Sequence, residues 1–198
     1  MITHLPEIGV TAISKWIFNC YVIHDAGDGR AVVVDLGMPS QLPLVSQVLR
    51  RRGCGLEGIV AAVATHGHLD HVGGLPALRA RAGTQVYLPE TIAELRSGAR
   101  PIRSPGPRQV AQILPVIADQ PRDVAALREL APLGKQIGYD SKGARFDFEP
   151  DAWLRDGTAP PAMGDWEVLH TPGHSDDSTC LYHCLLYTSD AADDMQCV

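Results

Sequence analysis

The chain has 198 residues, of which 45% are hydrophobic, and its net charge is −6. This length and hydrophobic content suffice for one compact domain with a hydrophobic core. This charge, with basic residues spread along the chain, argues against a nucleic-acid partner, and no stretch approaches the roughly 20 apolar residues of a membrane span. A polar start after Met1 and five cysteines without a C-x-x-C pair predict a soluble, cytoplasmic protein with reduced thiols.

Six segments have strand character, because they are short and rich in β-branched, aromatic or continuous apolar residues. In chain order they are residues 16–23, 30–37, 58–64, 84–89, 165–174 and 178–183. A turn signal at Asp28 and Gly29 predicts that the first two are antiparallel. The third is apolar throughout, which is typical of a strand covered on both faces.

Helical patterns alternate with these strands. Residues 40–53 place apolar side chains at helical spacing behind a Ser40 cap, and residues 73–83 end at Gly83. The alternation favours an α/β layered domain. Residues 98–161 differ in composition, with Gly/Pro/Arg-rich stretches around helical patterns at 109–119 and 123–130. We expect this range to be a helical insertion and not a second domain.

The stretch THGHLDHVGG, residues 65–74, follows the third strand and concentrates metal-capable side chains. They are His66, His68, Asp70 and His71. Residues two apart on a helix face different ways, so His66 and His68 converge only if Gly67 is extended or in a loop. Two imidazoles favour zinc or iron over magnesium or calcium, and three ligands with an open water position make such a site catalytic. The alternative is a surface loop with fortuitous histidines.

The pattern T-H-x-H-x-D-H followed by G-G resembles the metallo-β-lactamase-fold hydrolase superfamily. The resemblance extends over residues 8–183, because VVVDLG, ending near Asp35, and HTPGHS, containing His174, follow the family's order. It implies an αββα sandwich in which His66, His68 and His174 bind a first metal. By the same resemblance Asp70 and His71 contribute to a second metal, and Asp35 either orients the histidine loop or caps a strand end.

This resemblance also implies the chemistry. One or two zinc ions, with iron as an alternative, would activate water for hydrolysis of a small-molecule ester, thioester, lactone, β-lactam or phosphoester. Asp70 would orient the water and receive its proton as the catalytic residue. The insertion at 98–161 would form a lid that selects the substrate.

Two other function classes remain open. One is the iron-dependent persulfide dioxygenase branch of the same fold, an oxidoreductase with a similar three-ligand set. The other is a non-catalytic or nucleic-acid-processing member. The flavin-linked di-iron branch is disfavoured. By the resemblance, that branch has Glu in place of one histidine of the motif, whereas this chain has His68 there.

Residues 184–198 have neither helical nor strand periodicity and resemble a translated sequencing adapter. We therefore expect residues 1–183 to be a family domain truncated at its C-terminus, without the bridging Asp and last His that the resemblance implies. The alternative is a polar tail, or a strand in which Asp190, Asp193 or Asp194 is a ligand. On the first view the chain binds at most one metal firmly and hydrolyses poorly; no pattern indicates its oligomeric state.

Overall fold

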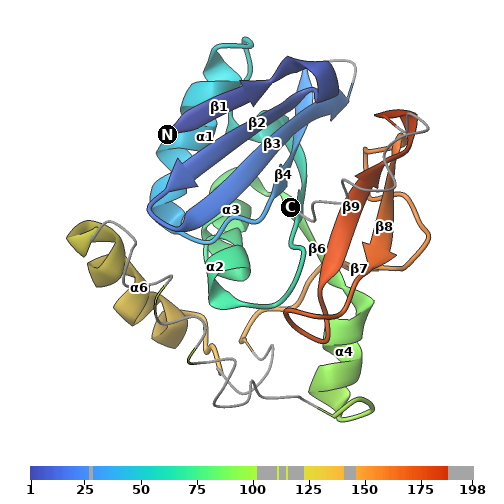
Figure 1. Cartoon of the computed structure of the whole chain (residues 1–198). Helices are drawn as coiled ribbons and strands as arrows, with labels where there is room; N and C mark the ends of the chain where they lie inside the picture. Colours follow the sequence, from blue (N-terminus) through green and yellow to red (C-terminus); the bar gives the residue numbers. More distant parts are fainter. Residues whose placement is uncertain (27–28, 102–110, 112–114, 116–122, 141–145, 187–198) are drawn as a thin grey trace.

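The computed structural model describes residues 1–26, 29–101, 111, 115, 123–140 and 146–186 (Figure 1). Its main element is a seven-stranded sheet in the order β1 to β7. These strands are β1 (Ile2–Leu5), β2 (Val10–Lys15), β3 (Phe18–Ala26), β4 (Arg30–Val34), β5 (Ile59–Val63), β6 (Gln85–Pro89) and β7 (Ala152–Leu154). Strands β1 to β4 are antiparallel, and β4 to β7 are parallel. The two remaining strands, β8 (Trp166–His170) and β9 (Thr179–His183), form a separate antiparallel hairpin.

Five α-helices connect the strands of the described residues. They are α1 (Leu42–Arg50), α2 (Leu69–Val72), α3 (Leu75–Ala82), α4 (Glu90–Ser97) and α6 (Val124–Gln136). Short 3-10 turns precede or follow the strands and α1 at Pro6–Ile8, Pro39–Gln41, Leu56–Gly58 and Cys184–Leu186. None of the described helices has the length and apolar character needed to cross a membrane.

The core consists of two apolar clusters, one on each face of the main sheet. On β4, Val33 points to the helix-covered face, whereas Val32 and Val34 point to the face that β8 and β9 cover. This alternation follows from the two-residue period of a strand. The described residues thus form three layers: helices, the seven-stranded sheet and the two-stranded hairpin (Figure 1).

All six predicted strands are present, and the antiparallel pairing of the first two is confirmed. Strand β5 is almost fully buried, as its apolar composition predicted. Helix α3 ends at Gly83, whose φ of 66° is the left-handed cap expected of a C-terminal glycine. The turn residue Asp28 lies outside the described residues.

The predicted Ser40 cap is wrong. Helix α1 begins at Leu42 after a 3-10 turn, and no side-chain cap bond is made at Gln41, its N-terminal neighbour. Instead the Gln41 side chain accepts a hydrogen bond from the backbone N–H of Met38, at 3.0 Å. The Ser40 backbone N–H donates to Glu129 on α6, and its hydroxyl is buried without a partner among the described residues. The Gln41 side chain therefore closes the 3-10 turn before α1 and does not cap α1 itself.

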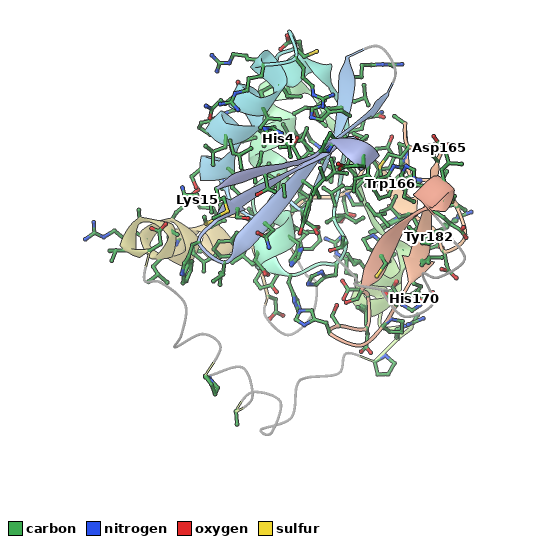
Figure 2. The ribbon with its side chains drawn as sticks, turned by 45° about the horizontal axis from the view of Figure 1, so that its top comes forward. His4, Lys15, Asp165, Trp166, His170 and Tyr182 are labelled. Carbon is green, nitrogen blue, oxygen red and sulfur yellow. The ribbon has the colours of Figure 1, made fainter. Side chains whose placement is uncertain are left out.

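The range 98–161 is closely joined to the main body. Helix α6 confirms the helical pattern at 123–130, and its Ala126 and Leu133 belong to the main core. Strand β7 pairs with β6 as an edge of the main sheet. Figure 2 shows Lys15, at the end of β2, beside α6, where its Nζ lies 3.7 Å from a Glu129 carboxylate oxygen. The pattern at 109–119 falls almost entirely outside the described residues.

Candidate metal centre

Three histidine side chains from two loops converge at the carboxyl end of β5. His66 and His68 lie in the loop between β5 and α2, and His174 lies in the loop between β8 and β9. Nε2 of His66 and Nε2 of His174 lie 3.0 and 3.1 Å from Nδ1 of His68. All three ligand atoms lie within 4.8 Å of one another. Of the sequence-predicted metal ligands, the structure brings these three into one cluster.

Hydrogen bonds to buried carboxylates hold the loop that carries His66 and His68. The Thr65 backbone N–H and hydroxyl donate to the two oxygens of Asp35, at 2.8 and 2.9 Å. His68 has an extended backbone, so His66 and His68 project to one side, as the loop position of Gly67 predicted. Asp35 is 2% exposed and has a φ of 57°, an unfavourable conformation for a residue with a side chain. The local fold is therefore strained where it supports the histidines.

A close backbone approach places the start of α2 against the loop after β4. The Gly74 N–H donates to the Leu36 carbonyl oxygen at 2.7 Å. A Cβ at Gly37 would overlap the carbonyl oxygen of Asp70. Gly37 is therefore required by space, and it lets the turn that carries Asp70 and His71 lie directly beside Asp35.

His71 is held between two carboxylates. Its Nδ1 lies 3.0 Å from Oδ2 of Asp35, and its Nε2 lies 3.4 Å from Oδ2 of Asp70. Burial alone would lower the pKa of His71, but the hydrogen bonds to Asp35 and Asp70 outweigh it and raise the pKa to about 10. Burial opposes ionisation of Asp70, yet the bond to His71 lowers the pKa of Asp70 to about 2. Asp70 and His71 are thus adjacent to each other, but the three-histidine cluster does not include them.

Two histidines of the cluster, His66 and His68, are held neutral. Burial, followed by the neighbouring His71, lowers the pKa of His66 to about 2. Burial and the His174 ring likewise lower the pKa of His68. A neutral imidazole offers the nitrogen lone pair that a metal requires. With zinc–nitrogen bonds of about 2.0–2.1 Å, tetrahedral ligands are roughly 3.3 Å apart, and the separations of 3.0 and 3.1 Å from His68 are close to this spacing.

Two residues near the centre were not predicted from the sequence. Asp177 is 3% exposed and accepts a hydrogen bond from the Gly67 N–H at 2.6 Å. Tyr139, after α6, forms a hydrogen bond with the Leu69 backbone, and burial raises the pKa of its phenol. Asp177 follows His174 by three residues, and this proximity was the available signal. No signal in the sequence pointed to Tyr139, because the segment that contains α6 meets α2 only in the folded chain.

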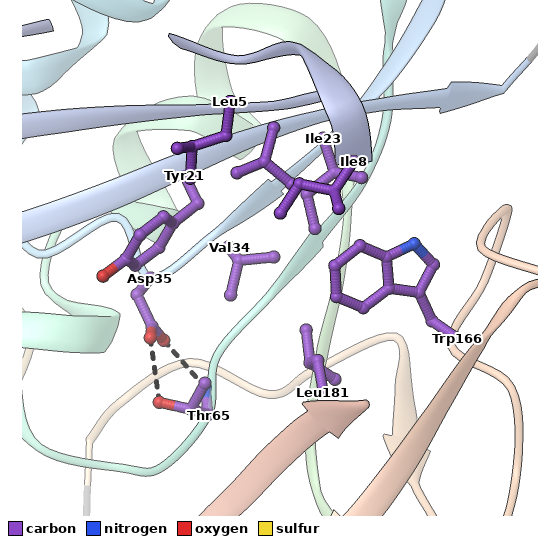
Figure 3. A pocket seen from close by; sticks show the side chains of 10 residues that line it. Leu5, Ile8, Tyr21, Ile23, Val34, Asp35, Thr65, Trp166 and Leu181 are labelled. Carbon is purple, nitrogen blue, oxygen red and sulfur yellow. Dashed lines mark hydrogen bonds between the residues drawn. The ribbon is translucent and has the colours of Figure 1, made fainter. Parts of the chain in front are cut away.

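A separate hollow of about 100 Å³ lies between the main sheet and the β8–β9 hairpin (Figure 3). Its walls are apolar and include Tyr21, Trp166 and Leu181, while Asp35 and Thr65 supply polar groups at one end. None of the three clustered histidines lines it. The hollow is therefore distinct from the histidine centre, although both share the Asp35–Thr65 contact.

Comparison with known proteins agrees with this geometry. The model of the family described as metallo-beta-lactamase superfamily matches residues 16–183. The chain belongs to the metallo-β-lactamase superfamily. Among solved structures with this fold, the FEZ-1 metallo-beta-lactamase of Legionella gormanii superimposes with a TM-score of 0.56 at 13% identity, over 87% of this chain and 54% of that one. A metallo-beta-lactamase of Cronobacter sakazakii superimposes with a TM-score of 0.53 at 17% identity, over 87% of this chain and 56% of that one. The predicted fold class is confirmed.

Several curated relatives of this metallo-β-lactamase superfamily chain have hydrolase names. A probable metallo-hydrolase of Bacillus subtilis, YflN, is 24% identical over 88% of this chain and 59% of its own length. A hydroxyacylglutathione hydrolase of Cereibacter sphaeroides is 41% identical over 66 residues, which are 33% of this chain and 24% of that protein. The chain thus spans between half and two thirds of the length of YflN and of the two metallo-beta-lactamase structures.

Proposed function

We propose that the chain is a zinc-dependent hydrolase whose three-histidine centre activates water against a small-molecule ester, thioester or lactone. The observation that carries the proposal is the convergence of three imidazole nitrogens in a chain of this superfamily. Zinc suits an all-imidazole donor set with tetrahedral separations. Iron accepts the same donors, so metal analysis of the purified protein is part of the test. We also keep the cytoplasmic location as a prediction.

The proposed roles follow from what each side chain contacts. His66, His68 and His174 would hold the metal, which lowers the pKa of a bound water toward about 7 and polarises a substrate carbonyl. Asp70 stays ionised because His71 lowers its pKa, so its carboxylate can accept the proton of the attacking water. Asp35 fixes the ring of His71 through Nδ1, as expected of an outer partner of a ligating imidazole.

Asp70 and His71 would contribute to a second metal. With its pKa raised to about 10, His71 carries a proton between the carboxylates of Asp35 and Asp70 when no cation is bound there. A second cation bound there would release this proton, because a ligating imidazole is neutral. We propose the three-histidine centre as the tighter site, since it already brings three imidazole donors together.

The segment that contains α6 is proposed to shape substrate access. Gly134 of α6 lies against the Leu69 side chain, and Tyr139 forms a hydrogen bond with the backbone of Leu69, the residue before Asp70. Side chains of this segment would therefore meet a substrate bound at the metal. Among substrates, thioesters come first for testing, because several relatives are named hydroxyacylglutathione hydrolases.

The test is hydrolysis of a generic thioester by the 198-residue chain before chelation, after chelation, and after zinc is restored. We expect weak activity that disappears with the chelator and returns with zinc. His68→Ala is expected to lose it, whereas His170→Ala is the matched control. His170 is the last residue of β8, next to the loop that carries His174, and lies outside the three-histidine cluster (Figure 2). Its Nε2 lies 3.0 Å from the Asp176 carbonyl oxygen. Chelator-resistant activity, or equal loss in both variants, would contradict the proposal.

A further inference from the structure

A buried carboxylate lies beside the three histidines without a role in the chemistry described above. Asp177 is 3% exposed, although it belongs to the short polar loop between β8 and β9. Its Oδ2 accepts a hydrogen bond of 2.6 Å from the backbone N–H of Gly67. Gly67 is the single residue between His66 and His68. Asp177 therefore holds the peptide that links these two histidines.

Thr179 adds two bonds between the same segments. Its backbone N–H and its hydroxyl both donate to the Thr65 carbonyl oxygen, at 2.9 and 2.8 Å. Three hydrogen bonds thus join residues 65–67 to residues 177–179, on both sides of His66. The Gly67 and Asp177 partners are 110 positions apart in the sequence. These bonds fix the distance between the two loops that carry the histidines.

The loop that carries His174 transmits this placement. Ser178 donates from its backbone N–H to the Ser175 carbonyl oxygen at 3.4 Å, and the two serine hydroxyls lie 2.7 Å apart. The Thr171 N–H donates to the Ser178 carbonyl oxygen at 2.9 Å. These hydrogen bonds within residues 171–178 hold the loop in one shape. A shift of Asp177 relative to Gly67 would therefore move His174 relative to His68.

Among the described residues, the charge of Asp177 has no direct cationic partner. Burying a carboxylate is costly unless hydrogen bonds or a positive charge compensate. Within the part of the chain that the structure describes, no Lys or Arg forms an ion pair with Asp177. The carboxylate is close enough to His68 to act electrostatically on its ring. A cation held by the three histidines would supply the missing positive charge.

We propose that Asp177 is a positioning residue of the metal centre, which fixes the Gly67 peptide between two ligands and supplies a buried negative charge that favours a bound divalent cation. This inference rests on the proposed function, because it presupposes a metal on His66, His68 and His174. Asp177 is not a ligand itself. Its Oδ2 is engaged by Gly67, and the cluster of metal-capable atoms found among the described residues does not include it.

The experiment measures cobalt affinity by chelator competition, together with the visible absorption bands of the cobalt-loaded protein. It compares the unsubstituted 198-residue chain with Asp177→Asn, Asp177→Ala and Asp165→Asn. Asn keeps an acceptor for the Gly67 N–H and removes the charge, whereas Ala removes both. Asp165→Asn is the matched control, because Asp165 is exposed at the turn before β8 and loses the same charge (Figure 2).

We expect Asp177→Asn to bind cobalt about 10-fold more weakly, with nearly unchanged absorption bands. Asp177→Ala is expected to lose up to about 100-fold in cobalt affinity, with shifted absorption bands. A role in folding alone would not shift the bands of the folded fraction. If Asp177→Ala does not fold, the affinity of Asp177→Asn decides. Affinity of Asp177→Asn within twofold of the unsubstituted chain, or an equal loss in Asp165→Asn, would overturn the inference alone. Absence of cobalt binding by the unsubstituted chain would overturn the proposed function as well.

Discussion

The Asp35 carboxylate lies 3.0 Å from Nδ1 of His71 and turns the other ring nitrogen of His71 toward Asp70. The same carboxylate accepts both hydrogen bonds of Thr65, the residue before His66. One buried side chain therefore supports both halves of the HxHxDH loop. Between the two roles that the sequence left open for Asp35, the contacts favour orientation of the histidine loop, and its effect on metal binding stays a prediction.

Replacing Asp35 with Ala is expected to destabilise the metal-free chain by about 1–3 kcal/mol, because the Thr65 donors and the buried His71 lose their partner. Urea unfolding at neutral pH measures this change. Thr65→Val, which removes only the hydroxyl donor, is expected to cost less. A smaller loss in Asp35→Ala than in Thr65→Val would contradict this assignment.

Gly37→Ala is expected to destabilise the fold by about 1–3 kcal/mol, since the added methyl group would overlap the Asp70 carbonyl oxygen and push α2 away from β4. Gly164→Ala is the matched control, because no atom lies within 4 Å of a Cβ built there. Thermal unfolding of both variants checks the prediction. Equal melting temperatures would show that the loop after β4 adapts without cost.

Stability should fall in acid partly because of His24. Burial, followed by the charges of Arg52 and His4, lowers the pKa of His24 from 6.5 to about 4. The folded state thus favours the neutral ring, so this contribution is present above pH 6.5 and is lost as the pH falls through about 4. We expect the His24→Leu variant to lose less stability than the unsubstituted chain between pH 7 and 4. Parallel pH profiles for the two proteins in urea unfolding would refute this.

The sequence predicted the histidine loop well because its signals are local. A continuous apolar strand, a glycine between two histidines and the turn at Asp70 lie within about a dozen residues. The strands around Val33 and Ala62 were equally clear from their apolar runs. Their registers depend on neighbouring strands, so no local pattern specified them.

The parts that the sequence missed depend on distant contacts. Strand β1 is short and mostly exposed, so Thr3 and His4 carry no strand pattern and pair only because β2 is adjacent. Strand β7 has three residues and forms on the edge of β6. Asp177 is buried through a contact 110 positions away. An aspartate in a polar loop is ordinarily exposed, so its sequence position alone predicted the opposite.

The most direct test of the three-histidine centre is zinc stoichiometry after equilibrium dialysis of the 198-residue chain and its single histidine variants. We predict one tightly bound zinc per unsubstituted chain, loss of tight binding in His66→Ala, His68→Ala and His174→Ala, and full retention in His170→Ala. Circular dichroism confirms that each variant is folded. Zinc content that is unchanged in folded His68→Ala and His174→Ala would show that these histidines do not hold the metal.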